Sequence, residues 1–496
     1  MANIIVCCDG TWNNESNQDD GVPAPTNVLR IFYAVNKTQQ KAHYQAGVGT
    51  GKLWDKIVGG AVGSGISTDI CECYLWLCRH YQSGDKLFLF GFSRGAYTAR
   101  SLGGMIGRYG LLDLSQSQSQ INDVQVLYND GYRQRKTTTE LDYLNFSYHP
   151  DSQHIEFIGV FDTVGALGIP NDKEFFNLFD NPEKYQFHDT KLGDTVKHAC
   201  HAVAIDEKRG SFTPTLWQAD PRVKQRWFAG VHSDIGGGYK ENGLSDCTLD
   251  WIIQEAQSHG LLFSEHMLEQ IQPNPLGRLH NSYKGVMKVL RSNPRAIPRM
   301  DAPEVDQTAK IRLANPPINQ GFYRPLNHFK NNQASVEVMA DIRWNWTGVY
   351  LQKGKRYRFL ATGTWFDRNI CCGPGGCDDG NFQFAEAIQA VGSLFGKAEK
   401  LFNRWFHRDN KKYQVSDFPF TKRVEDQDWF CLMGAIPKAE NPDKDGSFVR
   451  PELFHIGDSS DYSPQTSGYL YCFANDAWGM YGNNSGEVSM IITELD

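Results

Sequence analysis

Residues 86–100 read KLFLFGFSRGAYTAR, in which an apolar run is followed by GFSRG at residues 91–95 and then by an alanine-rich helical pattern. That order predicts a strand, a sharp turn and a helix, with Ser93 at the tip of the turn. The glycines on either side of the turn remove the side chains that would clash in so tight a bend. A serine held in this way is a candidate nucleophile. The alternative is a serine that caps a helix after a buried strand.

The sequence on both sides of this stretch alternates between strand and helix patterns from residue 1 to about residue 325. A helix is expected over 28–35, capped by Thr26-Asn27. Residues 59–81 start glycine-rich and are expected to become a second, long helix that leads to the Ser93 strand. The predicted strands are 4–8, 87–90, 155–161, 202–205 and 226–231. Strands separated by helices predict a mostly parallel sheet with helices on both faces, an α/β hydrolase-like fold.

Polar residues follow the predicted strands at their carboxyl ends, where ligands and catalytic groups collect in such sheets. Ser93, Asp162 and His232 occur in the chain order of an α/β-hydrolase triad of nucleophile, acid and base. His232 is expected to end a strand, before a flexible glycine run. Asp206 also follows a strand and is the alternative acid, and a structural histidine or a helix-capping aspartate would explain the same residues without catalysis.

An oxyanion hole requires two backbone N–H groups. The first is expected from Arg94, directly after the nucleophile, and the second from Gly10 or Thr11 in the turn after the first strand. Asp9 is either the residue that orients this turn or an ordinary turn aspartate.

Five motifs in this region resemble the α/β-hydrolase family of type VI secretion lipase effectors, in the same order: DGTWN, GFSRGAYTAR, GVFDTVGALG, AVAIDEKR and WFAGVHSDIGGGY. Known members are phospholipases delivered into rival bacteria. The resemblance covers about residues 1–325 and implies Ser93 as nucleophile, with His232 and an aspartate as its partners. It also implies a lipid ester substrate, secretion-apparatus partners and an immunity protein.

Length and charge restrict the remaining possibilities. The chain has 496 residues, which predicts two or three domains. Its formal net charge of −7 argues against a general nucleic-acid binder. The start, MANIIVCCDG, is unlike a secretory signal peptide, and no apolar run is long enough to span a membrane. We expect a protein made in the cytoplasm that, if exported, leaves by a leaderless route.

The 12 cysteines are scattered and contain no pair of C-x-x-C units, so a structural zinc site is not expected. Most should be buried free thiols, although Cys377 could form a disulfide in an oxidising compartment.

From about residue 331 to 496 the pattern changes to short alternating strands with Gly, Asn and Asp in the turns. Strands are expected at 335–344, 349–351, 357–363, 448–454, 468–474 and 488–493, a pattern typical of an all-β sandwich. One loop, NDAWGMYGNNSG at residues 475–486, offers a carboxylate, amides and a carbonyl as oxygen ligands, which suits Ca²⁺. The same residue types also favour plain turns.

This segment resembles small bacterial calcium-dependent, galactose-binding lectins, through TGVYLQKGKRYRFLATGTW and the ND…YGNNSG loop. The resemblance implies calcium ligands at Asp476, the Met480 carbonyl, Asn483 and Asn484, with a further carbonyl from the 363–367 region, assigned to Asp367. It also implies a galactoside ligand. CGPGGC and a long insertion depart from the lectin pattern, so calcium could be kept without galactose.

The insertion carries a helical stripe of apolar residues over about 384–408 with Lys397, Lys400, Arg404 and Arg408 beside it. It is expected either to pack across the domain boundary or to contact a membrane surface. Two functions remain: a serine lipase or phospholipase with a calcium-binding, lectin-like module, and a carbohydrate-binding protein whose esterase-like domain is inactive.

Overall fold

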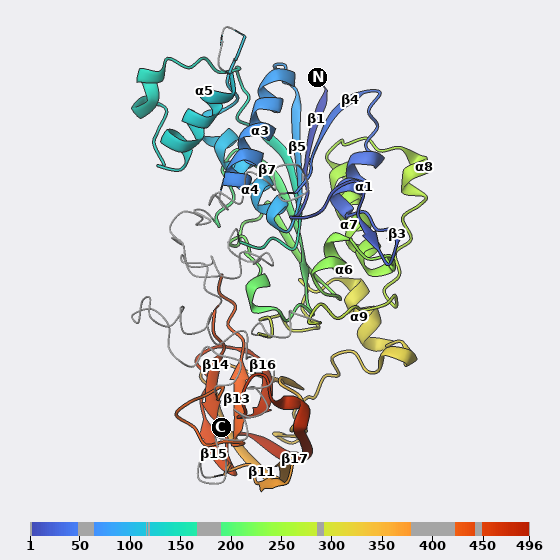
Figure 1. The fold of residues 1–496 in the computed structure, drawn as a ribbon, viewed down its shortest axis with the longest axis vertical. Coiled ribbons are helices and arrows are strands. Elements are labelled where there is room, and N and C mark those ends of the chain that lie inside the picture. The colour runs from blue at the N-terminus through green and yellow to red at the C-terminus, as the bar shows by residue number, and fades with distance from the viewer. Residues whose placement is uncertain are drawn as a thin grey trace, which may run out of the picture. The chain divides into compact units, whose positions relative to one another are not determined.

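The computed structural model describes residues 2–47, 64–115, 117, 120–165, 190–284, 292–377, 422–441 and 449–495. The helix expected at 384–408 lies outside these residues. The chain forms two compact units, each built from several segments (Figure 1). The first consists of residues 1–282, 300–323 and 440–449, and the second of residues 283–299, 324–439 and 450–496.

The first unit is built on a sheet whose described strands lie in the order β4-β1-β5-β6-β7-β8 and are all parallel. This confirms the predicted α/β hydrolase-like sheet. The strands are β1 (Asn3–Cys8), β4 (Gln40–Gln45), β5 (Lys86–Phe92), β6 (Ile155–Phe161), β7 (Val196–Ala204) and β8 (Val223–Phe228). A small hairpin is formed by β2 (Gln18–Asp19) and β3 (Val22–Pro23).

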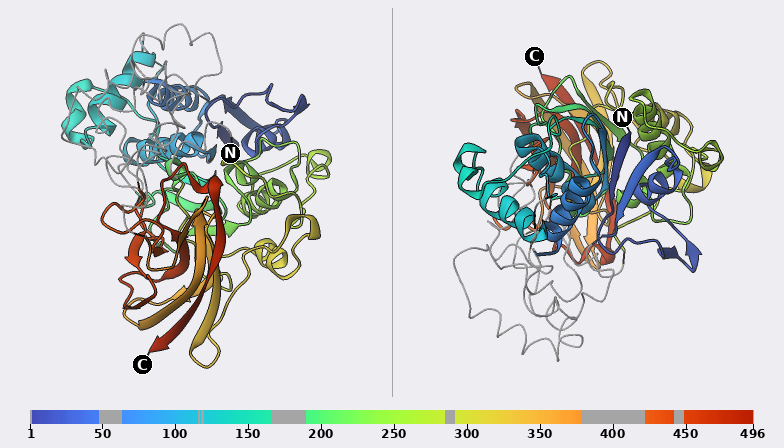
Figure 2. Two further views of the ribbon diagram at one scale, coloured as in Figure 1. Left: turned by 60° about the horizontal axis from the view of Figure 1, so that its bottom comes forward. Right: turned by 90° about the horizontal axis from the view of Figure 1, so that it is seen from above.

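Helices cover both faces of this sheet (Figures 1 and 2). On one face lie α3 (Ser64–His80) and α4 (Arg94–Tyr109), and on the other α1 (Asn27–Ala34) and α7 (Gly243–Ser258). Alternate strand residues serve the two cores: Ile4 and Val6 join one cluster, Ile5 and Cys7 the other. The predicted parallel sheet is therefore buried on both sides, as its continuous apolar strands require.

Shorter helical elements complete the described part of this unit. They are α5 (Gln120–Val126), the π-helix η1 (Leu127–Tyr132), η2 (Thr139–Leu144), η5 (Gly210–Phe212), α6 (His232–Gly236), α8 (Glu265–Leu268), α9 (Gln307–Ala314) and η7 (Ile318–Gln320). Thr26 caps α1 as expected, since its side chain accepts from the Leu29 N–H.

Two strand predictions in this unit were wrong in their extent. The strand expected at 226–231 is β8, which ends at Phe228. Gly230 has a φ of 128° and turns the chain, so His232 begins α6 rather than ending a strand. The strand expected at 202–205 is the last part of the longer β7.

The second unit consists of two antiparallel sheets around one core, the all-β architecture predicted for this region. One sheet has the described order β10-β16-β13-β14, and the other β12-β11-β17-β9, with β15 also paired to β11. The strands are β9 (Gln333–Met339), β10 (Asn345–Leu351), β11 (Arg356–Asp367), β12 (Ile370–Cys372), β13 (Leu432–Ile436), β14 (Glu452–His455), β15 (Ser459–Tyr462), β16 (Gly468–Ala474) and β17 (Asn484–Leu495). A single 3-10 turn, η10 (Tyr481–Asn483), precedes β17.

One asparagine explains why the strand expected at 335–344 ends early. The Oδ1 of Asn345 accepts from the Met339 N–H at 2.9 Å, and its Nδ2 donates to the carbonyls of Met339 and Ile342 at 3.0 Å each. The amide group thus closes a turn between β9 and β10.

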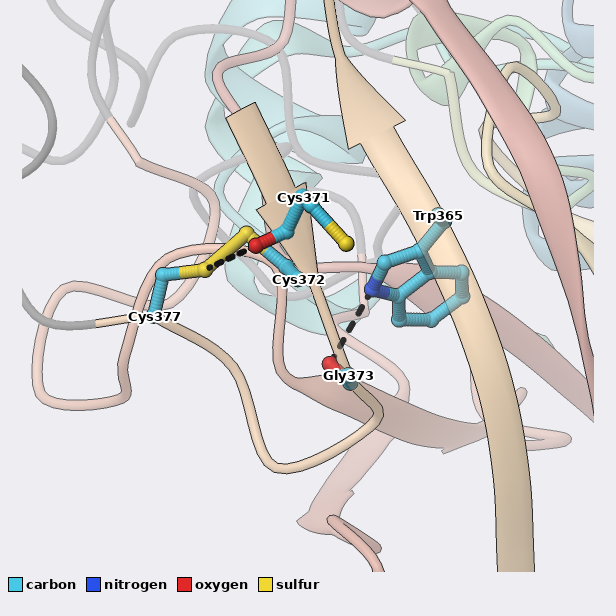
Figure 3. Close-up of a disulfide and its surroundings, with 5 residues drawn as sticks. All are labelled: Trp365, Cys371, Cys372, Gly373 and Cys377. Carbon is cyan, nitrogen blue, oxygen red and sulfur yellow. Dashed lines mark hydrogen bonds between the residues drawn. A yellow bond between two sulfur atoms is a disulfide. The ribbon is translucent and has the colours of Figure 1, made fainter. Parts of the chain in front are cut away.

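A disulfide joins Cys372 to Cys377 across the Gly-Pro-Gly-Gly turn (Figure 3). Beside it, the Trp365 indole N–H donates to the Gly373 carbonyl at 3.2 Å. The remaining ten cysteines are free, and all of them except Cys371 are buried. No helix in the described ranges is long and apolar enough to cross a membrane.

Candidate active site

The turn that carries Ser93 is as abrupt as the sequence predicted. β5 ends at Phe92 and α4 begins at Arg94, so Ser93 alone makes the turn, with φ 58° and ψ −122°. Left-handed backbone of this kind costs about 1–3 kcal/mol in a residue with a side chain, and the surrounding structure must hold it in place. A Cβ on Gly95 would lie 2.1 Å from the Cys8 carbonyl oxygen, and one on Gly91 would lie 2.4 Å from the Gly95 carbonyl oxygen.

Ser93 and Asp162 follow adjacent strands at the same edge of the sheet. The Ser93 N–H donates to the Phe161 carbonyl at 3.0 Å, directly before Asp162. Asp162 is fully buried and also left-handed, with φ 38°. Its Oδ1 accepts from the Ala204 N–H at 2.9 Å. These backbone contacts fix the carboxylate at the carboxyl ends of β5, β6 and β7.

His232 lies against this carboxylate. Its Nδ1 is 2.6 Å from the Asp162 Oδ2, and both side chains are buried. The imidazole ring contacts the ring of Phe92, the residue before Ser93, at 4.7 Å between centroids. Burial lowers the pKa of His232, and the hydrogen bond that its Nδ1 donates to Asp162 opposes that shift.

The second ring nitrogen, Nε2 of His232, is buried and has no hydrogen-bond partner in the described part of the chain. A neutral imidazole that donates from Nδ1 to Asp162 leaves a lone pair on Nε2. The arrangement can therefore accept a proton at Nε2 while the carboxylate stabilises the resulting cation.

Asp206, the alternative acid, takes part in other contacts. Its Oδ2 accepts from the Gly230 N–H at 2.8 Å and from the Tyr323 hydroxyl at 2.9 Å. The carboxylate thus ties the turn after β8 to residue 323.

The turn after β1 reaches the nucleophile: a Cβ on Gly10 would lie 3.2 Å from the Ser93 Cβ. The Gly10 N–H donates to its neighbour, the Asp9 Oδ1, at 2.7 Å. Asp9 Oδ2 accepts from the Thr26 and Tyr44 hydroxyls at 2.6 and 2.7 Å. Asp9 therefore does orient this turn. Burial raises its pKa to about 6, although these three hydrogen bonds lower it.

Two groups in this region were missed by sequence reasoning. Glu207 lies in the AVAIDEKR motif, yet nothing in the sequence assigned it a role. Its carboxylate accepts from the His232 N–H at 3.2 Å. Phe212 packs edge-on against the His232 ring, with centroids 4.8 Å apart. The spacing Glu207-x-Arg209 was a usable signal, because such a pair can form a local ion pair.

The candidate calcium residues of the second unit also lie together. Asn484 Nδ2 donates to the Asp476 Oδ2 at 2.8 Å, and Asn483 Nδ2 donates to the Asp367 Oδ1. Asn483 N–H donates weakly to the Met480 carbonyl at 3.4 Å. Burial raises the pKa of Asp476 to about 7, and the charge of Asp367 adds to the shift.

These residues fit a hard cation in two respects. Two carboxylates and two amides supply oxygen ligands, the type that Ca²⁺ prefers. Within the described residues, the Asn484 Oδ1 is buried without a hydrogen-bond donor. Asn475, at the start of the motif, is instead structural, since its amide bonds the backbone of residues 424, 427 and 428. No group of three or more His, Cys, Asp or Glu side chains suited to a metal occurs in the described ranges.

Comparison with known proteins adds a family to this geometry. The family described as "T6SS, Phospholipase effector Tle1-like, catalytic domain" matches residues 2–255. An uncharacterised protein of Saccharomyces cerevisiae, YEL023C, is 29% identical over 245 residues, which are 45% of this chain and 33% of the yeast protein. The chain thus spans about a third of that relative.

Two solved structures show more distant likenesses. The Tle1 effector bound to the VgrG spike of the type 6 secretion system is 20% identical, with a TM-score of 0.28, over 48% of this chain and 51% of that one. A PllA-like lectin, the EclA N-terminal domain, is 17% identical, with a TM-score of 0.19, over 34% of this chain and all of that one. The family match takes in the Ser93 turn, Asp162 and His232 and extends over just more than half of the sequence, so the chain belongs to the family of Tle1-like phospholipase effectors.

Proposed function

We propose that this protein is a serine hydrolase of phospholipid esters in which Ser93, His232 and Asp162 form the triad. The observation that carries the proposal is the Asp162–His232 pair, 2.6 Å apart, beside the strained turn of Ser93. The family is one of phospholipase effectors, which supports a lipid ester as substrate.

In this mechanism His232 Nε2 takes the proton of the Ser93 hydroxyl as Oγ attacks the ester carbonyl carbon. The tetrahedral intermediate collapses when the bond to the alcohol oxygen breaks, and that oxygen receives the proton from His232. Water, deprotonated by the same histidine, then attacks the acyl-serine ester. The bond to Ser93 Oγ breaks, Oγ takes the proton back from His232, and the fatty acid is released. Asp162 remains ionised throughout and stabilises the imidazolium.

The oxyanion would be held by the N–H of Arg94 and by a second donor from the turn after β1. Gly10 donates its N–H to Asp9, which favours Thr11 for this role. The negative charge that develops on the substrate oxygen is stabilised only by donors already in place.

The test is hydrolysis of phospholipid in mixed micelles by purified protein. Ser93→Ala should lose several orders of magnitude in kcat, because triad members act as a unit. Ser101→Ala is the matched control, since Ser101 is a buried serine on α4, the helix that follows Ser93. Wild-type activity in Ser93→Ala would exclude the triad. If the wild type and both variants are inactive and the wild type binds sugar, the alternative is favoured, a carbohydrate-binding protein with an inactive esterase-like domain.

We further propose that the second unit binds Ca²⁺ through Asp476, Asn483, Asn484, the Met480 carbonyl and Asp367, and that a galactoside hydroxyl can complete the shell. The buried Asn484 Oδ1 supports a cation at this place. Retention on immobilised galactose in calcium, with release by chelator, would support both parts. Binding of calcium without retention would leave a metal-stabilised module without that sugar specificity.

Delivery is proposed on the same basis. The protein would be made in the cytoplasm, loaded on a type VI secretion spike and neutralised in the producing cell by an immunity protein. Its export should stop when the secretion apparatus is inactivated, and pull-down of tagged protein should recover a spike component. Export that continues without the apparatus would contradict this route.

A further inference from the structure

The carboxylate of Glu207 gathers donors from three separate segments of the first unit. Its side chain has no exposed surface. Oε1 accepts from the Lys208 and Arg209 N–H groups at 3.0 and 2.9 Å, and from the Ser282 hydroxyl at 2.9 Å. Oε2 accepts from the His232 N–H at 3.2 Å. A buried carboxylate with this many donors is rigidly held, because each unmade bond would leave a charged oxygen unpaired.

Arg209 balances this charge and extends the contact to the catalytic ring. Its Nε and Nη2 donate to the two carboxylate oxygens of Glu207 at 2.9 and 2.8 Å. Its guanidinium lies 3.4 Å from the centroid of the Phe212 ring. Phe212 meets the His232 imidazole edge-on, and this contact is separate from the one that Phe92 makes with the same ring. Glu207 thus reaches His232 twice, once through the backbone N–H of His232 and once through the side chains of Arg209 and Phe212.

The backbone contact matters because of where His232 lies. It is the first residue of α6, a helix of five residues. Such a short helix has little stability of its own, since helix formation is cooperative. The N–H of its first residue also has no partner within the helix. An outside acceptor is therefore needed to fix the direction in which the imidazole leaves the chain.

We propose that Glu207 is a positioning residue that fixes His232 at the start of α6, so that Nδ1 meets Asp162 while Nε2 stays directed to the nucleophile. This inference rests on the proposed function, since it assigns His232 the role of general base. Glu207 need not touch the substrate for this role.

A second ion pair between an acidic residue and an arginine, in the same unit, provides a matched control. Asp220 and Arg222 are separated by one residue, as are Glu207 and Arg209. The Asp220 carboxylate accepts from the Arg222 N–H, Nε and Nη2 at 2.9, 3.0 and 2.7 Å. That pair bonds the backbone of residues 193–196 through Arg222 and makes no described contact with His232. Asp220→Asn therefore removes a similar local ion pair without disturbing the triad.

The first measurement is kcat and KM of Glu207→Gln and Asp220→Asn on a soluble short-chain ester. Glu207→Gln should lower kcat by roughly 10- to 100-fold with little change in KM, because a displaced base costs rate and not binding. Asp220→Asn should keep wild-type kcat. A Glu207→Gln protein with wild-type kcat would overturn the inference.

The second measurement is the pH dependence of kcat/KM, which a purely structural role would not move. The charged groups acting on the imidazole are Asp162, Arg209 and Glu207. Loss of the Glu207 charge should lower the pKa of His232 and move the acid limb to lower pH. Arg209→Gln removes the opposing charge and should move it to higher pH. Shifts in the same direction, or none, would contradict the assignment.

The third measurement does not depend on activity. The Nδ1 proton of His232, held by Asp162, should give a low-field proton resonance that Asp162→Asn abolishes. Glu207→Gln should weaken or broaden it, and Asp220→Asn should leave it unchanged. If Ser93→Ala proves fully active, the triad fails, yet this resonance still decides whether Glu207 positions His232. Should Glu207→Gln not fold, Arg209→Gln and Ser282→Ala weaken the same contacts, and an unaltered resonance in both would overturn the inference.

Discussion

His232 and Asp162 are 70 residues apart in the chain, and yet the Nδ1 of one lies 2.6 Å from the Oδ2 of the other, with both side chains buried. The parallel sheet makes this contact possible, because the chain that leaves β8 for His232 emerges at the same edge of the sheet as the end of β6. The pair sets the tautomer of the imidazole and so determines which nitrogen can act as a base.

The acid can be identified by comparing two conservative substitutions. Asp162→Asn should lower kcat on the order of 10³- to 10⁴-fold, because an amide in place of the carboxylate favours the wrong imidazole tautomer. Asp206→Asn should have a much smaller effect, since Asp206 accepts from Gly230 and Tyr323. The reverse ranking in the same ester assay would move the acid to Asp206.

The acid limb of the pH–rate profile should lie below the ordinary histidine pKa of 6.5. Burial lowers the pKa of His232, so the imidazole loses its proton, and becomes a base, at lower pH than a free histidine would. kcat/KM should therefore rise with pH and level off before neutrality. A limb centred above 6.5 would show that another group, or a charged histidine, controls the rate.

The turn beside Ser93 should not tolerate a methyl group at Gly47. A Cβ there would lie 1.8 Å from the Gly10 carbonyl oxygen and 2.9 Å from the Thr11 nitrogen. Gly47→Ala should displace the proposed oxyanion donor and lower kcat on the order of 100-fold. Gly193→Ala is the control, because its nearest neighbour would be 3.8 Å away. Equal activity of the two variants would remove this turn from the mechanism.

Calcium binding to the second unit should weaken as the pH falls below about 7. The pKa of Asp476 is raised to about 7, so protons compete with the metal for this carboxylate below that pH, and the affinity should then fall roughly tenfold per unit. Titration calorimetry at pH 5.5 and 8 measures this difference. Asp476→Asn should abolish this difference in affinity between the two pH values, whereas Asp461→Asn, on the exposed strand β15, should leave it unchanged. An affinity independent of pH would argue against Asp476 as a ligand.

The same carboxylate predicts how the metal-free protein responds to pH. A folded-state pKa above the ordinary value of 3.8 means that the folded chain binds the proton more tightly than the unfolded chain. Stability from this group is therefore complete below about pH 4 and is lost as the pH rises through 7. The melting temperature of the second unit in chelator should fall over that range for the wild type more than for Asp476→Asn. Calcium should reverse the loss.

The sequence predicted the Ser93 turn well, because an apolar strand followed by two glycines around a serine is typical of a tight strand-to-helix turn. Prediction from the sequence failed for elements whose extent depends on contacts with distant parts of the chain. β4, with the sequence QKAHYQ, has no apolar run and was not predicted, since an edge strand is held by β1 on one side only. His232 was placed at a strand end because residues 227–231 are apolar, although β8 ends at Phe228 and the left-handed Gly230 turns the chain.

The gathering of Asp162 with His232 was predictable in kind, because the segments that follow parallel strands emerge at the same edge of the sheet. The choice between Asp162 and Asp206 was not, since both follow strands and only the observed hydrogen bonds separate them. Glu207 was invisible for a similar reason. Its partners, Ser282 and the His232 backbone, lie 75 and 25 residues away.

The path of the chain between the two units has a consequence for dissection of the protein. Asn441 pairs with the backbone of Leu216 through its Oδ1 and Nδ2, at 2.7 and 3.0 Å, so a segment 225 residues downstream completes the first unit. In the other direction, Ser292 accepts from the Trp344 indole N–H of the second unit. A single cleavage near residue 330 would therefore take residues 440–449 from one unit and residues 283–299 from the other. The two halves of the polypeptide are therefore not independent folding units. Recombination near residue 330 should yield products in which both units lack a segment.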